Sequence, residues 1–170
     1  MWAAIVEVGY ALYFILPAYA ANATPVVLGG GRPIDCGRKF RDGKPIFGSH
    51  KTFRGFFLGL AVGTLVSIGL NFVLKYNVLL GFMTSLGALV GDLVKSFIKR
   101  RLNLVPGESL PLADQLDFVF GALLFSLPVS PPSPLTALII ILVTPPIHFL
   151  TNLLANVVKN RKRSGERRVS

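Results

Sequence analysis

The chain has 170 residues, of which 52% are apolar and 15% are charged, and its mean hydropathy is +0.60. This composition excludes an ordinary soluble globular domain, in which about a quarter of the residues are charged. The formal net charge of +10 is compatible with nucleic-acid binding, but the chain has no RNA- or DNA-binding motif and its basic residues flank apolar stretches. We therefore expect anionic lipid headgroups and phosphates as partners, and no nucleic acid.

Five apolar stretches are long enough to cross a bilayer as helices, which takes about 20 residues because each backbone polar group must be satisfied within the segment. They lie at about 2–21, 54–74, 77–98, 112–129 and 135–158. We predict an all-α, polytopic membrane protein with five transmembrane helices, forming one transmembrane catalytic domain over residues 1–170. The longer loops are expected at about 22–53 and 99–111, and a basic tail at 159–170.

The Lys and Arg residues are distributed unequally among the connections. Seven lie in the first loop, four around the end of the third span and six in the tail, and Lys75 alone lies in the other two connections. The positive-inside rule places these three Lys- and Arg-rich segments in the cytoplasm, so the N-terminus is outside and the C-terminus inside. We predict a multi-pass protein of the cell membrane whose active site faces the cytoplasm.

Glycines recur every four residues in the second and third spans. They are Gly55, Gly59 and Gly63, then Gly87 and Gly91. This spacing lets helix backbones approach closely. We expect packing within the chain, and a homodimer as a further possibility.

One face of the third span carries polar side chains at helical spacing. They are Asp92, Lys95, Ser96 and Lys99. A charged residue inside a span is costly unless it faces protein, a cation or water, so Asp92 is a functional candidate. The alternative is a structural ion pair of Asp92 with Lys95 or Lys99.

Two further carboxylates, Asp114 and Asp117, are expected at the start of the fourth span, at the same depth as Asp92. Clustered carboxylates need a neutralising cation, and oxygen ligands suit Mg²⁺, which binds substrate phosphates. We predict a magnesium site formed by these three aspartates; the alternative is a favourable contact of first-turn acids with the helix dipole. Cations beside such a site suit phosphoryl or nucleotidyl transfer. The predicted catalytic residues are Lys95, Ser96, Lys99 and Arg100.

The first loop is rich in glycine and basic residues, and we expect its backbone amides, with Lys51 or Arg54, to wrap a polyphosphate. A solvated basic loop lying on anionic lipid is the alternative.

The third and fourth spans resemble the C-terminal signature of the phosphatidate cytidylyltransferases. The resemblance rests on Gly91-Asp92-Leu93, Ser96, Lys99-Arg100, Leu110-Pro111 and Asp114-Gln115-Leu116-Asp117. The lysine-aspartate pair and His-Gly-Gly of that family are absent between Leu102 and Ser109.

A resemblance to the shorter CDP-archaeol synthase family covers nearly the whole chain. Its hallmarks are Pro17-Ala18-Tyr19-Ala20-Ala21-Asn22-Ala23, Gly29-Gly30-Gly31, Pro33-Ile34-Asp35, Phe40-Arg41-Asp42-Gly43 and Lys51-Thr52-Phe53-Arg54-Gly55. The resemblance implies that CTP and 2,3-di-O-geranylgeranylglyceryl phosphate, a prenylated glycerol phosphate lipid, become CDP-archaeol and pyrophosphate with Mg²⁺. The residues expected to bind the nucleotide are Asn22, Asp35, Arg38, Lys39, Asp42, Lys51, Thr52 and Arg54.

Two other functions stay open at this stage. One is a cytidylyltransferase for ester phosphatidate, because the apolar cleft that reads the lipid chains is not visible in the sequence. The other is a divalent-cation channel or transporter, because carboxylates within spans also line ion paths. Clustering of the acidic residues at the inner face argues against the channel.

Overall fold

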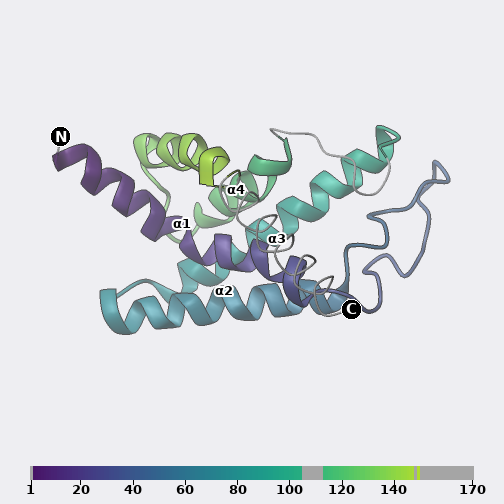
Figure 1. The fold of residues 1–170 in the computed structure, drawn as a ribbon, viewed down its shortest axis with the longest axis horizontal. Helices are drawn as coiled ribbons and strands as arrows, with labels where there is room; N and C mark the ends of the chain where they lie inside the picture. Colours follow the sequence, from purple (N-terminus) through teal and green to yellow (C-terminus); the bar gives the residue numbers. More distant parts are fainter. Residues whose placement is uncertain (1, 105–112, 148, 150–170) are drawn as a thin grey trace, which may run out of the picture.

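The computed structural model describes residues 2–104, 113–147 and 149. These residues form α1 (Trp2–Leu28), α2 (Phe53–Leu74), α3 (Val78–Arg101) and α4 (Ala113–Ser126). A further helix, called the fifth helix below, spans Pro134–Ile147. The only extended pairings within the described ranges are two isolated bridges in the first loop. The all-α prediction is therefore confirmed (Figure 1).

Three of the helices, α1, α2 and α3, are long and apolar enough to cross a membrane. The other two are shorter: α4 has 14 residues and ends at Ser126, before the predicted limit of 129. The fifth helix is described from Pro134 to Ile147. Apart from Phe149, the rest of that predicted span lies outside the described residues, as do the tail and most of the predicted loop 99–111.

The predicted ends of the first and third spans were wrong. The polar Asn22 predicts the start of the loop, but α1 continues to Leu28 with Pro17 and Pro25 inside it. The helix ends where Gly29 donates to the carbonyl of Pro25 and the following glycines adopt positive φ. The third span likewise continues to Arg101 instead of 98, so its basic residues are helical.

Helix α3 lies at the centre of the fold and packs against α1, α2 and α4. The apolar core between them includes Phe14, Ile15 and Phe118, each at most 2% exposed. Glycines permit this packing: a Cβ on Gly63 would collide with Ser85, and one on Gly59 would come within 2.8 Å of the Ala21 carbonyl oxygen. The predicted packing of the glycines within the chain is confirmed.

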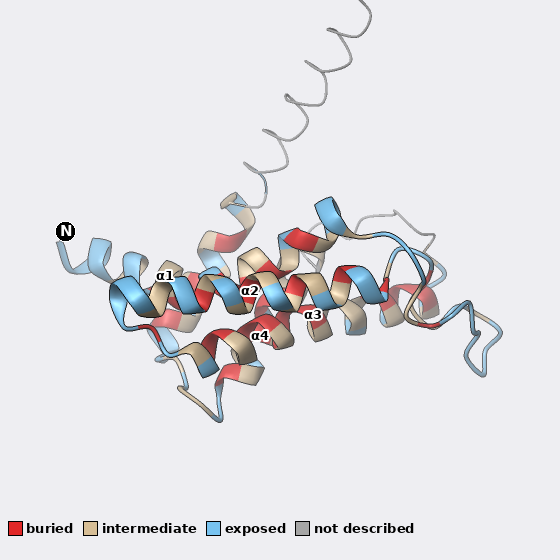
Figure 2. Cartoon of the chain, turned by 90° about the horizontal axis from the view of Figure 1, so that it is seen from below, coloured by how far each residue is buried: buried red, intermediate tan, exposed pale blue. Residues whose placement is uncertain are grey.

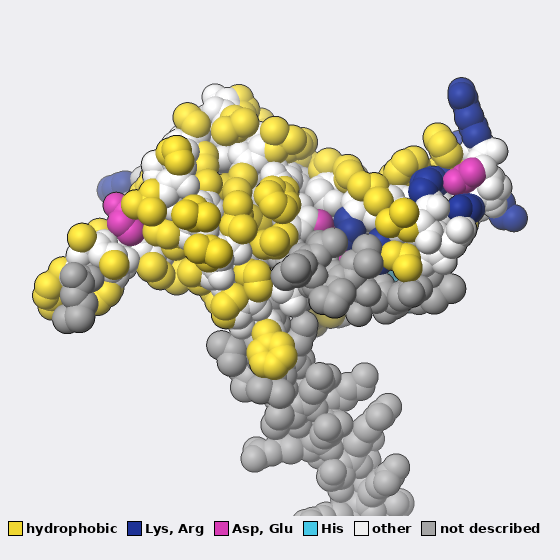
Figure 3. All heavy atoms as spheres, turned by 90° about the horizontal axis from the view of Figure 1, so that it is seen from above, with side chains coloured by type: hydrophobic (Ala, Val, Ile, Leu, Met, Phe, Trp, Pro, Cys, Tyr) yellow, Lys and Arg dark blue, Asp and Glu magenta, His cyan; other side chains and the backbone are white. Residues whose placement is uncertain are grey.

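The outer surface of the helices is strongly apolar. On α2 the exposed side chains include Phe57, Leu65 and Phe72, which are 61%, 64% and 78% exposed. Figure 2 shows buried residues where the helices meet and exposed ones along the outer face of α2, and Figure 3 shows hydrophobic side chains covering much of the helical body. Such a surface suits a bilayer, because burial in lipid removes it from water.

Candidate active site

Three carboxylates from two helices converge on one ammonium group. The Lys95 Nζ lies 3.3 Å from Asp92 Oδ1, 3.5 Å from Asp114 Oδ1 and 2.7 Å from Asp117 Oδ2. Asp92 comes from α3, whereas Asp114 and Asp117 come from the start of α4. The structure therefore brings these three carboxylates together, as predicted.

Two further lysines extend this group. The Nζ of Lys51, in the first loop, lies 2.5 Å from Asp92 Oδ2, and the Nζ of Lys99 lies 2.9 and 3.0 Å from the two oxygens of Asp114. We call these six residues, three aspartates and three lysines, the carboxylate cluster. Its formal charges balance, which removes the repulsion expected among bare carboxylates. The structural Asp92–Lys95 ion pair is thus present, whereas Lys99 pairs with Asp114.

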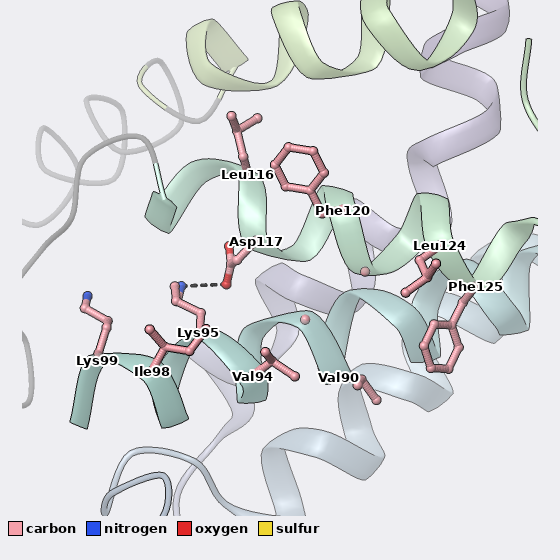
Figure 4. Close-up of a pocket in the computed structure, with 12 residues that line it drawn as sticks. Val90, Val94, Lys95, Ile98, Lys99, Leu116, Asp117, Phe120, Leu124 and Phe125 are labelled. Atoms are coloured by element: carbon pink, nitrogen blue, oxygen red, sulfur yellow. Dashed lines mark ion pairs between the residues drawn. The ribbon is translucent and has the colours of Figure 1, made fainter. Parts of the chain in front are cut away.

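Helix geometry and close packing position the cluster. Residues 92, 95 and 99 share one face of α3 because they are three and four residues apart. A Cβ on Gly91 would collide with the backbone carbonyl of Asp117, so the absence of a side chain there allows α4 to approach. Figure 4 shows Asp117 reaching from α4 toward Lys95 on α3.

A polar cavity of about 440 Å³ lies on the first-loop side of the cluster. Its lining combines the end of α1, the glycine run and the segment before α2. The lining residues are Pro25, Val26, Val27, Gly29, Gly30, Gly31, Ser49, His50, Lys51, Thr52 and Asp92. A glycine-rich wall with a lysine is suited to phosphate groups, because it exposes backbone N–H donors.

An apolar groove of about 500 Å³ lies on the other side, between α3 and α4. Its lining residues are Val90, Gly91, Val94, Lys95, Ile98, Lys99, Leu116, Asp117, Phe120, Gly121, Leu124 and Phe125 (Figure 4). Val94, Phe120 and Leu124 are 51%, 55% and 62% exposed, so the groove is open at the outer surface of the bundle. Among the described residues that line it, the charged ones are Lys95, Lys99 and Asp117, which all belong to the carboxylate cluster.

Asp35 holds the first loop, residues 29–52, in shape. Its carboxylate accepts hydrogen bonds from the backbone N–H groups of Gly37, Phe47 and Gly48 at 3.0, 3.0 and 2.8 Å. Burial by itself raises the pKa of Asp35, but these backbone donors outweigh it and hold the pKa below its ordinary value. The carboxylate therefore ties two distant parts of the loop together in its charged form.

Other predicted site residues lie outside the carboxylate cluster. Ser96 is buried and donates to the backbone carbonyl of Asp92, and Arg100 is buried beside Gly48. Thr52 caps α2 by accepting a hydrogen bond from the N–H of Gly55. Their predicted catalytic or nucleotide-binding roles stay predictions.

The remaining predicted nucleotide ligands are spread along the first loop and its borders. Asn22 is half-buried inside α1, whereas Arg38, Lys39 and Arg54 are exposed. Asp42 is exposed in a hairpin of the loop, where its Oδ1 accepts a hydrogen bond from the N–H of Lys44. None of these five residues lines the polar cavity.

The ligand atoms of the carboxylate cluster are of the type that Mg²⁺ prefers, because Mg²⁺ binds carboxylate oxygens in proteins. The buried Asp117 Oδ2 lies 2.7 Å from the Lys95 ammonium nitrogen, its one ion-pair partner among the described residues. Yet the Lys95 ammonium occupies the point where a shared cation would lie, and the described residues contain no group of three acidic, His or Cys side chains ready to hold a metal ion. If Lys95 moves aside, Asp92, Asp114 and Asp117 are the residues that would hold the metal.

The apolar helices and the charged cluster at one end of the bundle define the class of this protein, an intramembrane enzyme. The chain is similar to a solved structure of an intramembrane enzyme for archaeal membrane lipids biosynthesis, with 38% identity and a TM-score of 0.79 over 84% of this chain and 92% of that one. A CarS-like family model, described as CDP-archaeol synthase, matches residues 4–162.

Relatives in several archaea support the same assignment. The CDP-archaeol synthase of Thermococcus gammatolerans is 52% identical over 153 residues, which is 86% of this chain and 90% of the relative. That of Methanocaldococcus jannaschii is 44% identical over 158 residues, 85% of this chain and 89% of the relative. The chain belongs to the CDP-archaeol synthase family, as the resemblance in its motifs indicated.

Sequence reasoning missed two features of the site. The structural role of Asp35 was signalled by Gly37, since an aspartate two residues before a glycine is typical of an Asx-turn. The second feature is Arg101, which donates hydrogen bonds to the carbonyls of Pro45 and Ile46 in the first loop. Its position four residues after Phe97 on α3 predicts a contact with that ring, but not with the loop.

Proposed function

We propose that the chain transfers the cytidylyl group of CTP to 2,3-bis-O-geranylgeranyl-sn-glycerol 1-phosphate, giving CDP-archaeol and pyrophosphate. The relatives from Thermococcus gammatolerans and Methanocaldococcus jannaschii are CDP-archaeol synthases, and the family model describes the same enzyme. The observation that carries the proposal for this chain is the position of the carboxylate cluster. It lies between a polar cavity that suits a nucleotide and an apolar groove that suits prenyl chains.

Residues of the carboxylate cluster line both the polar cavity and the apolar groove. Asp92 and Lys51 line the polar cavity, whereas Lys95, Lys99 and Asp117 line the apolar groove. A lipid phosphate at the charged end of the groove and a triphosphate in the polar cavity would therefore meet at the carboxylate cluster, which borders both spaces. The groove opens on the outer surface, so the prenyl chains can enter sideways from the bilayer.

The reaction needs no general base, because a phosphate monoester is already ionised near neutral pH. One of its oxygens attacks the α-phosphorus of CTP and forms a new P–O–P link, while the bond from the α-phosphorus to the bridging oxygen breaks and pyrophosphate leaves with that oxygen. Holding both partners in line supplies much of the rate. The ammonium groups of Lys95 and Lys99 stabilise the negative charge on the lipid phosphate and the leaving group.

Magnesium is part of this proposal. When bound, Mg²⁺ would neutralise charge on the triphosphate. Asp92, Asp114 and Asp117 would hold the metal, and their ion pairs with lysines hold the three carboxylates together in its absence.

The enzymatic proposal is tested with purified protein, CTP, Mg²⁺ and either the geranylgeranyl ether phosphate or an ester phosphatidate. We expect pyrophosphate and CDP-lipid in equal amounts with the ether lipid, and little product with the ester. Asp114→Asn should abolish turnover while the protein stays folded and monodisperse in detergent. Full turnover by this variant would remove the metal role of Asp114, and failure of wild type with both lipids would overturn the proposed function.

The proposal includes five transmembrane helices, an outside N-terminus and a cytoplasmic first loop and C-terminus. The chain offers a natural reporter of this topology, because its single cysteine, Cys36, is exposed and lies in the first loop. A membrane-impermeant maleimide should label Cys36 in inverted vesicles and not in right-side-out ones. The opposite pattern would reverse the proposed orientation.

A further inference from the structure

The last residue of α3, Arg101, is bound to the far end of the first loop. Its Nη1 donates to the carbonyl oxygens of Pro45 and Ile46 at 3.0 and 3.1 Å. Its Nη2 donates to Asp42 Oδ1 at 3.3 Å, and its Nε lies 3.2 Å from Asp42 Oδ2. One guanidinium group therefore engages both a carboxylate and two backbone carbonyls of the same hairpin.

Two aromatic rings and a hydrogen bond from the loop to α3 strengthen this attachment. The guanidinium carbon lies 3.9 Å from the ring centre of Phe97 on α3 and 4.7 Å from that of Phe40 in the loop. The two rings also contact each other edge to face, with centres 5.3 Å apart. In the opposite direction, the Lys44 Nζ donates to the backbone carbonyl of Arg101 at 3.0 Å.

The attached segment is a small hairpin with its own internal bonds. Lys39 and Pro45 form an antiparallel bridge, the N–H of Phe40 donates to the carbonyl of Lys44, and Gly43 turns the chain with a φ of 75°. The N–H of Ile46 also donates to the carbonyl of Arg38, and we call residues 38–46 the hairpin. Figure 1 shows the first loop extending beyond the helix ends on the side where α3 ends.

We infer that Arg101 is a positioning residue for the nucleotide: it fastens the hairpin to α3 and thereby fixes the loop wall of the polar cavity. This inference rests on the proposed function. The chain runs from the hairpin directly into Phe47 and Gly48, which Asp35 holds, and then into Ser49–Thr52, which line the cavity. Loop and carboxylate-bearing helix are thereby held as one body, and the cavity exists before CTP binds.

An arginine is needed for this role. Its planar guanidinium presents several donors in fixed directions and stacks on aromatic rings, whereas a lysine ammonium is a point charge on a flexible stem. Arg101→Lys should therefore rescue the attachment only in part. Arg41 offers a matched control, because it is an exposed arginine of the same hairpin and forms no ion pair or hydrogen bond with the described residues.

The first experiment measures amide hydrogen exchange and steady-state kinetics of the full-length enzyme in detergent. For Arg101→Gln we expect at least tenfold faster exchange at the N–H groups of Gly43 and Ile46, a five- to thirtyfold higher KM for CTP and a smaller change in kcat. Arg41→Gln should match wild type in both measurements. Unchanged exchange in Arg101→Gln would overturn the attachment, and faster exchange with an unchanged KM would overturn its link to the nucleotide.

A double-mutant cycle separates positioning from direct nucleotide contact. If Arg101 acts through the hairpin, Asp42→Asn should raise the KM for CTP in wild type but add little in the Arg101→Gln background. Fully multiplicative effects would overturn the inference. Absence of CTP turnover in wild type would count against the proposed function alone, since the exchange measurement reads the attachment without it.

Discussion

The ammonium nitrogen of Lys95 lies 2.7 Å from Asp117 Oδ2, in an ion pair that joins α3 to α4 at the meeting point of three carboxylates. Both side chains are largely buried, 17% and 7% exposed. The same position would suit the Mg²⁺ proposed above, so the lysine and a bound metal ion would compete for one place. This competition has a measurable consequence.

Replacing Lys95 by Met should make the protein depend on Mg²⁺ for stability. Removing one partner of a buried ion pair costs about 3–5 kcal/mol, because the remaining charges are left uncompensated. We expect a lower Tm than wild type in EDTA and a larger rise in Tm on adding Mg²⁺, measured by thermal unfolding in detergent. Arg41→Met is the control, and equal Mg²⁺ responses in all three proteins would contradict the competition.

Gly91→Ala should impair the active site without touching a charged residue. The added methyl group would collide with the carbonyl of Asp117, so α4 must move away from α3. Displacement of a reacting group by about 1 Å costs on the order of 100-fold in rate. We expect a loss of this size in kcat and a lower Tm.

Gly69 provides the control for this substitution, since it lies on the exposed side of α2 with nothing within 4 Å of an added Cβ. Gly69→Ala should leave turnover unchanged and stabilise the helix by about 0.5–1 kcal/mol. If Gly91→Ala behaves like Gly69→Ala, the close approach of α3 and α4 is not needed for activity.

Leu124→Trp should obstruct the apolar groove. Overfilling an apolar site costs about 1–3 kcal/mol, which corresponds to about 5- to 150-fold in kcat/KM for the prenyl lipid. The KM for CTP should not change, because the polar cavity lies on the other side of the cluster. Leu65→Trp on α2 is matched in exposure, 64% against 62%, and should match wild type. Equal losses in the two variants would show that the groove does not bind the lipid chains.

Asp35→Asn should reduce stability at neutral pH and have less effect in acid. The folded-state pKa of Asp35 lies below its unfolded value, so the charged carboxylate stabilises the fold above the unfolded pKa, about 3.9, and that contribution is lost as the pH falls through the folded value. Hydrogen bonds to a charged group contribute about 1.5–3 kcal/mol each. We expect the Tm difference from wild type to be full at pH 7 and to shrink below pH 4.

Glu7→Gln controls for the loss of a carboxylate, because Glu7 forms no ion pair or hydrogen bond with the described residues. Its Tm should follow wild type throughout this pH range. A constant Tm deficit of Asp35→Asn from pH 7 to pH 3 would show that its hydrogen bonds do not depend on the charge.

The class of the protein, the positions of most of its helices and the convergence of Asp92, Asp114 and Asp117 could be predicted from the sequence. Hydropathy and helical period are local properties of the chain, so they placed α2 nearly to the residue and put Asp92 and Lys95 on one face. Hydropathy did not predict the end of α1 correctly, because it assigned Asn22 to the loop. Whether a helix continues through polar and proline residues depends on how it packs against its neighbours.

The contacts of the charged residues could be identified only once the chain is folded. That Lys51 pairs with Asp92, that Lys95 occupies the centre of three carboxylates and that Arg101 holds the hairpin are contacts between distant segments, which no local pattern specifies. The polar cavity and apolar groove on opposite sides of the cluster arise in the same way. Their shapes are set by how closely the glycines let helices approach and by how the first loop folds back onto α3.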